Sequence, residues 1–316
     1  MPVEGRPGSW QRHPWVRRAS LAQRRAGRLP ATVRGLLWSA TSGLVFVVLN
    51  TVMRGLALQM DPFETQFLRY LAGIAVMLPF VLRSGLRSYV PRNIGGQFLR
   101  GGVHTVGLYL WFFALPHISL ADTTAIGFTT PIFIMFGAVL LLKEPMRWER
   151  WVAAALGFAG VLLVVGPQLT GGSYYALVML ASSPVYAASY LITKALTRYE
   201  RAAVIVVWQA ISVTLCSLPL AVLHWQWPTA GQWVLVLLCG VLGSTGHYCL
   251  TRSFSVTDIS ATQSVKFLDL VWAALLGWMA FGDWPSQWSL IGGAVICAST
   301  VWIARRESRG PAPASA

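Results

Sequence analysis

Two charged residues lie three positions apart in a stretch that is otherwise apolar enough for a lipid bilayer. Lys266 and Asp269 occur in SVKFLDLVW, residues 264–272. On an α-helix this spacing puts both side chains on one face, within reach of each other. Each charge in mid-membrane costs about 2.5 to 3.5 kcal/mol. The two residues therefore form either a structural ion pair that fixes the helix, or a binding site in which Lys266 contacts a carboxylate and Asp269 an amine or a proton.

Other polar and aromatic residues within apolar segments are further candidates for substrate binding or coupling. His104 and His247 either titrate near neutral pH or join helices by hydrogen bonds. Arg69 either contacts an anion or has a structural role. Aromatic residues in such segments pack between helices, or they line a cavity that suits a planar or amine-bearing ligand. The candidate set is completed by Tyr109, Trp111 and Gln263.

Four more charged residues have expected roles near helix ends. Arg54 ends the first apolar segment and Glu64 begins the second, so we expect them to pair and hold the first hairpin. We expect Glu144 and Asp283 at helix ends on opposite sides of the membrane, where they organise loops.

The four cysteines lie in apolar stretches without metal-ligand spacing, which indicates packing residues. We expect no metal and no cofactor.

The composition requires lipid to cover most of this chain. Of its 316 residues, 55% are hydrophobic and only 11% are charged, whereas a soluble domain has about 25% charged residues. A helix needs about 20 apolar residues to cross the hydrocarbon core. Ten segments satisfy this requirement and are predicted to be transmembrane helices, at 35–55, 63–83, 97–115, 120–142, 151–167, 173–193, 203–223, 232–251, 259–280 and 288–304.

The distribution of lysine and arginine predicts the orientation. Every second connection carries basic residues, and the connections between them carry none. By the positive-inside rule, the basic connections and both termini are cytoplasmic. Only Arg54, Arg69 and Lys266 depart from this rule. Residues 1–33, with seven arginines and one acidic residue, are predicted to be a disordered cytoplasmic tail on anionic lipid, or alternatively a mitochondrial transit peptide. The net charge of +14 thus reflects orientation, and we expect no nucleic-acid binding.

The chain contains an internal repeat. Residues 123–160 align without gaps on residues 262–299, which places Glu144 on Asp283 and Phe128 on Phe267. Each half has five apolar segments, so the second half starts on the opposite side of the membrane and is inverted. Inverted repeats are typical of secondary transporters with a substrate site near mid-membrane. The predicted repeats are 34–168 and 173–306, followed by a disordered tail at 307–316.

Several motifs resemble those of a known transporter family. They are FETQFLRYLAGIAVMLP (63–79), which includes Arg69, LADTTAIGFTTPIFIMFGAVLLLKEP (120–145), and the WVAAALGFAGVLLVV that begins at residue 151. The chain resembles EamA-type carriers of the drug/metabolite transporter superfamily over residues 34–306. The first half resembles most closely the branch of bacterial S-adenosylmethionine and riboflavin carriers. The second half departs from the pattern, with Leu270 at the family's proline position and Asp283 in place of glutamate. Lys266 and Asp269 lie outside the general motif.

These observations predict an all-α integral membrane protein of ten transmembrane helices in two inverted five-helix repeats. We expect a multi-pass inner-membrane carrier that moves a small, zwitterionic, amino-acid-derived metabolite by alternating access. Export is favoured over the alternative, uptake of a vitamin or S-adenosylmethionine-like solute. The chain has no HExxH motif and no phosphate loop, so we expect neither an enzyme nor ATP drive. An integral-membrane enzyme or scaffold is the alternative of another class. Protons as the coupling ion and a homodimer are left open.

Overall fold

A computed structural model describes residues 29–57, 59–114, 117, 126–165, 174–223, 225–281 and 287–309. These described residues form helices and no strand. Residues 1–28, most of the predicted N-terminal tail, lie outside them. The first half contains α2 (Ala31–Ala57), α3 (Pro62–Ser84), the short 3₁₀-helix η2 (Leu86–Tyr89), α4 (Ile94–Ala114), α6 (Thr130–Leu142) and α7 (Trp148–Val165). The second half contains α8 (Tyr174–Leu196), α9 (Ala202–Leu223), α10 (Ala230–Val256), α11 (Ile259–Lys266), α12 (Leu268–Phe281) and α13 (Gln287–Arg309).

Residues close in sequence set several helix ends. The side chain of Asp61 accepts hydrogen bonds from the backbone N–H groups of Phe63 (2.8 Å) and Glu64 (3.2 Å), and Pro62 occupies the first helical position of α3. Thr229 and Gln232 form a reciprocal capping box at the start of α10. These helices therefore begin where short-range hydrogen bonds satisfy their first N–H groups.

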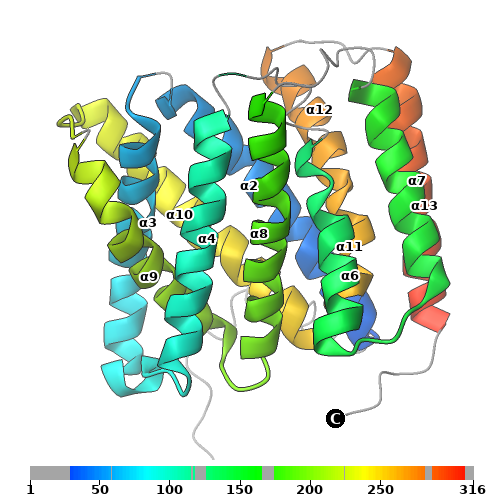
Figure 1. Cartoon of the computed structure of the whole chain (residues 1–316), viewed down its shortest axis with the longest axis horizontal. Coiled ribbons are helices and arrows are strands. Elements are labelled where there is room, and N and C mark those ends of the chain that lie inside the picture. The colour runs from blue at the N-terminus through cyan, green and yellow to red at the C-terminus, as the bar shows by residue number, and fades with distance from the viewer. Residues whose placement is uncertain are drawn as a thin grey trace, which may run out of the picture.

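The two halves run in opposite directions. Figure 1 shows that α2 begins and α13 ends at its lower edge, which we name the terminal edge. From there α2 runs upward, whereas α8, the first helix of the second half, runs down toward the terminal edge. The opposite edge of the bundle holds the starts of α3 and α10. The halves are thus inverted with respect to each other.

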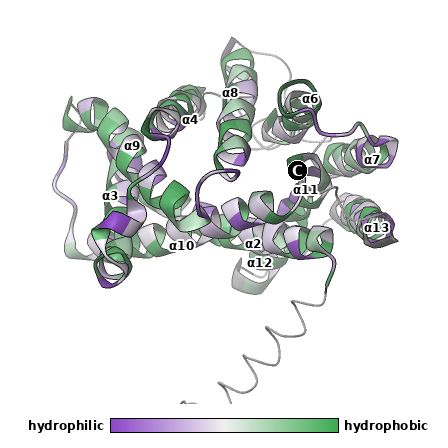
Figure 2. Ribbon diagram, turned by 90° about the horizontal axis from the view of Figure 1, so that it is seen from below, coloured by the Kyte–Doolittle hydropathy of each residue, from purple (hydrophilic) through white to green (hydrophobic). Residues whose placement is uncertain are grey.

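Helix packing follows the same inverted symmetry. In Figure 2, α2 and α10 cross on one side of the bundle, and α4 packs beside α8 on the other. Exchanging the halves converts the α2–α10 contact into the α8–α4 contact, and the α3–α10 contact into the α9–α4 contact. The α3–α9 and α7–α13 pairs are unchanged by this exchange. Corresponding helices of the two halves therefore occupy equivalent places in one bundle.

The surface of the described residues is apolar. Exposed side chains include Leu99, Val106, Leu140, Leu223 and Leu237. Large exposed apolar areas are unstable in water and stable in lipid. Within the part of the chain that the structure describes, six stretches are long and apolar enough to cross a membrane: α3, α8, α9, α10, residues 31–53 of α2, and residues 259–276 of α11 and α12. The chain is therefore a multi-pass membrane protein, and the count of ten crossings stays a prediction.

The ninth predicted segment is not one continuous helix. It is interrupted at Phe267, between α11 and α12. The first half turns at the equivalent place, Phe128 and Thr129, just before α6. The rings of Phe128 and Phe267 stack with centroids 5.7 Å apart. The residues paired by the sequence repeat thus meet where both halves depart from regular helix.

One helix extends past its predicted end. The predicted tail at 307–316 begins before the end of α13, which continues to Arg309, and the carboxylate of Glu307 is buried between two arginines. Arg100 lies inside α4, within the predicted helix 97–115, and is only 1% exposed. Neutral acceptors from α8 and α9 hold its guanidinium there, so burial does not require a carboxylate.

Candidate functional site

The hydroxyl of Tyr70 lies at the centre of a polar cluster where helices from both halves meet. It is 3.1 Å from Nε2 of His104 on α4 and 3.4 Å from Nε2 of His247 on α10. Arg69 donates to the same oxygen over 3.2 Å. Nδ1 of His104 lies 3.3 Å from the hydroxyl of Ser189 on α8. Three predicted site residues, Arg69, His104 and His247, are therefore brought together by a tyrosine that we did not predict.

Arg100 and Gln209 extend this cluster toward the terminal edge. The Arg100 guanidinium donates to Thr193 Oγ1 over 2.5 Å, to the Ile205 carbonyl over 3.1 Å and to Gln209 Oε1 over 2.6 Å. The amide nitrogen of Gln209 is 3.5 Å from His247 Nε2. These contacts join α4, α8, α9 and α10. We name Arg69, Tyr70, His104, Gln209 and His247 the central cluster.

Lys266 and Asp269 form an ion pair at the break between α11 and α12. Lys266 Nζ is 3.0 Å from Asp269 Oδ2, and the two side chains are 20% and 23% exposed. The ammonium also lies 5.6 Å from the ring centroid of Phe46, whose ring packs against His247 at 5.0 Å. Gly43 on α2 leaves the space that the Asp269 carboxylate fills, because an added Cβ would collide with it. The pair is therefore adjacent to the central cluster, through Phe46.

A narrow cavity opens beside the central cluster. Arg69, Tyr70, Gln209 and His247 line it together with small residues of α3 and α10: Gly73, Gly240, Gly243 and Ser244. Because glycines carry no side chain, they leave the polar groups uncovered on this side. Among the described residues, no group of His, Cys, Asp or Glu is arranged to hold a metal ion. In this conformation the cavity has a volume of about 10 Å³, roughly one water molecule, so it must widen before an organic solute can reach these groups.

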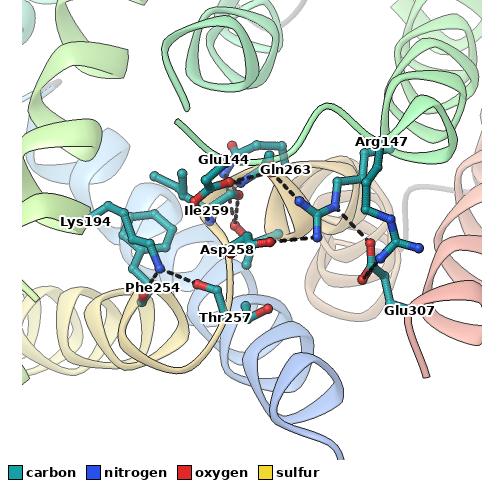
Figure 3. A network of polar contacts seen from close by, with 12 residues as sticks. Glu144, Arg147, Lys194, Phe254, Thr257, Asp258, Ile259, Gln263 and Glu307 are labelled. Atoms are coloured by element: carbon teal, nitrogen blue, oxygen red, sulfur yellow. Dashed lines mark hydrogen bonds and ion pairs between the residues drawn. The ribbon is translucent and has the colours of Figure 1, made fainter. Parts of the chain in front are cut away.

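A second polar network joins helix ends at the terminal edge (Figure 3). Glu144 accepts from the backbone N–H groups of Ile259 (2.8 Å) and Ser260 (3.1 Å), so the acid of the first repeat caps α11 of the second. Arg150 contacts Asp258 (3.0 Å) and Glu307 (2.9 Å). Since a helix N-terminus favours negative charge, Glu144 fixes the start of the broken helix, in keeping with the predicted role at a helix end.

Lys194 closes the neighbouring helix end in the same network. Its Nζ donates to the carbonyls of Phe254 and Thr257, each over 2.7 Å, where α10 ends (Figure 3). Arg147 completes the network with an ion pair to Glu307 at 2.9 Å. Residues from both halves therefore link helix ends at the terminal edge.

Three further predicted site residues lie away from the central cluster. The Tyr109 hydroxyl donates to the Cys216 carbonyl over 3.2 Å, and its ring packs on Phe63. Trp111 packs against the apolar core. The Gln263 amide donates to the Ile259 carbonyl in its own helix over 2.8 Å. Their observed contacts are those of packing and helix stabilisation.

The roles predicted for Glu64 and Asp283 involve residues that the structure does not describe in full. Glu64 accepts from the Gln226 N–H over 3.1 Å, so it ties α3 to the segment before α10. The side chain of Arg54, its predicted partner, and the whole of Asp283 lie outside what the structure describes. The pairing of Arg54 with Glu64 stays a prediction.

Comparison with known families agrees with this architecture. A profile of the EamA-like transporter family matches twice, at residues 33–166 and 173–305. The chain belongs to the EamA-like transporter family. It is therefore a multi-pass membrane transporter, as its resemblance to EamA-type carriers indicated.

Relatives of this chain are named as transporters of different solutes. A riboflavin transporter of Rhizobium johnstonii is 31% identical over 88% of this chain and 93% of its own. An S-adenosylmethionine uptake transporter of Rickettsia prowazekii is 27% identical over 89% and 96%. A pseudopaline exporter of Pseudomonas aeruginosa is 26% identical over 86% and 96%. A crystal structure with 19% identity superposes with a TM-score of 0.75 over 88% of this chain and 99% of its own, which shows the shared fold.

Sequence reasoning missed Tyr70, Arg100 and Gln209 in this EamA-like transporter. Gln209 carried a usable signal, because it is an amide inside an apolar helix. Arg100 lies near the start of α4, close to a loop in which a charged residue is ordinary. Its position in the sequence therefore does not indicate that its side chain is buried. Tyr70 follows Arg69 directly in the sequence, within the family motif at residues 63–79, and nothing in that motif indicates a site role for it. Its role depends on the proximity of α4 and α10.

Proposed function

We propose that this EamA-like transporter is a secondary carrier for a small zwitterionic, amino-acid-derived metabolite in the inner membrane. Alternating access would open the cavity first at one edge of the bundle and then at the other. The inverted halves support this proposal, because such repeats supply equivalent inward and outward states. In such a cycle, the contacts of the terminal-edge network would have to break when the cavity opens at that edge.

The observation that carries the proposal is the Lys266–Asp269 pair at a helix break beside the central cluster. Ionisable groups inside a membrane bundle are expensive and typically serve transport. Broken helices place such groups at the substrate sites of many secondary transporters. An ammonium and a carboxylate 3.0 Å apart suit the carboxylate and the amine of an amino-acid-derived solute.

We further propose uptake as the direction, although the sequence alone favoured export. The S-adenosylmethionine carriers among the relatives are named for uptake, and S-adenosylmethionine carries the ammonium and the carboxylate of an amino acid. Export is the second candidate, which the name of the pseudopaline exporter favours. Counterflow of labelled solutes in right-side-out and inverted membrane vesicles distinguishes the two directions.

A charge exchange tests whether the ion pair contacts substrate. The double variant Lys266→Asp with Asp269→Lys retains an ion pair at the same spacing but reverses its orientation. We expect a folded, membrane-inserted protein with no transport in proteoliposomes, and the single variant Lys266→Met should also lose transport. Lys143→Met, at the exposed end of α6, is the matched control and should transport normally.

Two results would contradict these expectations in different ways. Normal transport by the exchanged pair would make it a structural ion pair, and the substrate site would lie elsewhere. Failure of the unmodified protein to exchange S-adenosylmethionine, amino acids or riboflavin under any gradient would contradict the carrier function itself.

A further inference from the structure

The positive charges at the centre of the bundle are not balanced by equal negative charge. Lys266 is neutralised by Asp269 at 3.0 Å. In the described part of the chain, neither Arg69 nor Arg100 has a carboxylate within ion-pair distance. An uncompensated charge inside a membrane protein is costly. The bundle centre therefore carries an excess of positive charge in the absence of substrate.

The two arginines differ in what remains available to a ligand. Arg100 is 1% exposed, and each of its three guanidinium nitrogens donates to a protein acceptor. Among the described residues Arg69 makes one hydrogen bond, to the Tyr70 hydroxyl at 3.2 Å, and its guanidinium lies 4.6 Å from the centroid of the Tyr70 ring, although a guanidinium carries five N–H donors. Its side chain lines the cavity. Arg69 thus has N–H donors that a ligand can use.

One flank of the Arg69 guanidinium is not covered by a side chain of α10. An added Cβ at Gly243 would lie 3.4 Å from Arg69 Nε, so the glycine keeps this flank of the guanidinium open. His247, which lines the same cavity and is 4% exposed, has no hydrogen-bond partner for Nδ1 among the described residues. A buried polar atom without a partner is rare unless a ligand or water satisfies it. Two polar groups of one cavity are therefore unsatisfied together.

We infer that Arg69 binds a carboxylate of the transported solute, and that this contact selects carboxylate-bearing substrates. The inference rests on the proposed transport function and refines its site. Because Asp269 neutralises Lys266 before the solute binds, the guanidinium of Arg69 supplies a further contact to the acid group beside that of Lys266. Guanidinium and carboxylate match in planar geometry and form two parallel hydrogen bonds, the strongest polar contact available to an amino-acid-derived ligand.

The unmodified protein provides the first test. Proteoliposomes preloaded with S-adenosylmethionine are assayed for uptake of labelled S-adenosylmethionine, its decarboxylated analogue, an amino-acid mixture and riboflavin. We expect uptake of S-adenosylmethionine to be preferred over uptake of its decarboxylated analogue by about tenfold or more, the ratio expected for loss of a charge-assisted hydrogen bond. Equal uptake of the decarboxylated analogue, or uptake of riboflavin at a comparable rate, would overturn the inference while leaving the carrier function standing.

Variants of Arg69 provide the second test. Arg69→Met should lose about tenfold or more in affinity for S-adenosylmethionine and little for the decarboxylated analogue, so the preference approaches about one. Arg69→Lys keeps the charge and should recover part of the preference. Arg83→Met removes an exposed arginine from the same helix and should behave as the unmodified protein.

The ratio of the affinities for S-adenosylmethionine and for its decarboxylated analogue distinguishes a binding role of Arg69 from a structural role. A structural role for Arg69 would weaken both ligands of the pair equally, and that result would overturn the inference. If Arg69→Met does not fold, the preference of the unmodified protein still decides the matter. Absence of all transport by the unmodified protein would reject the proposed function, and the inference with it.

Discussion

The hydroxyl of Tyr70 joins three helices, α3, α4 and α10, through one atom. Its hydroxyl contacts a histidine on α4, a histidine on α10 and the neighbouring Arg69. In a low-dielectric interior such hydrogen bonds are strong, and their loss leaves buried polar atoms unsatisfied. The residue therefore joins helices of both halves and holds the central cluster in place.

Replacing Tyr70 by phenylalanine tests this role directly. Tyr70→Phe keeps the ring and removes the hydroxyl, so His104 and His247 lose a shared partner. We expect unfolding in detergent to become easier by about 1 to 3 kcal/mol, with reduced transport. Tyr248→Phe, at an exposed position of α10, is the control and should change stability by less than about 0.5 kcal/mol. Equal behaviour of the two variants would contradict a role for the hydroxyl.

At the scale of helices, close packing of α3 against α10 forms one wall of the central cavity. Gly240 lies so near α3 that an added Cβ would be 2.8 Å from backbone and side-chain atoms of Ala72. A backbone neighbour cannot move aside as a flexible side chain can. Small residues let membrane helices approach in this way. The position of Arg69 and Tyr70 beside His247 thus depends on a glycine of another helix.

A pair of identical substitutions on α10 tests this contact. Gly240→Ala should destabilise the protein by about 1 to 3 kcal/mol, because the helices must separate. Gly231→Ala, in the first turn of α10, meets nothing within 4 Å and should be neutral or stabilising by up to about 1 kcal/mol. Thermal unfolding of the purified variants measures both effects. A tolerant Gly240→Ala would mean that α3 and α10 are less closely packed.

At the scale of the whole molecule, the basic residues of the connections lie at one edge of the bundle. The connections of the terminal edge carry Arg87, Arg92, Lys143 and Arg198. The start of α10, at the opposite edge, follows the sequence WQWPTA, which has no basic residue. The positive-inside rule therefore predicts that the terminal edge faces the cytoplasm.

Single cysteines at the two edges test this orientation after the four native cysteines have been replaced. Ser84→Cys, at the end of α3, should react with a membrane-impermeant maleimide only after the cells are permeabilised. Ala230→Cys, at the start of α10, should react in intact cells. Both positions are exposed. The reverse pattern of labelling would invert the predicted orientation.

The sequence by itself determined the class of the protein, the repeat and most helix positions. Hydropathy suffices for the class, because a chain with 11% charged residues cannot cover itself with a polar surface. Helix starts such as Asp61–Pro62 are local, since a cap contacts N–H groups two or three residues away. The repeat placed Phe128 on Phe267 by alignment alone, and the stacked rings agree with it.

Only the tertiary structure decided which polar residues meet. Tyr70 and His247 are 177 positions apart and touch because α3 crosses α10. Arg100 is buried because acceptors on α8 and α9 surround it, a fact that no local pattern contains. The break at Phe267 likewise separates Lys266 and Asp269 onto two helices while keeping them paired. Hydropathy reports how deep a residue lies in the membrane, whereas the partner of its side chain depends on how the helices cross.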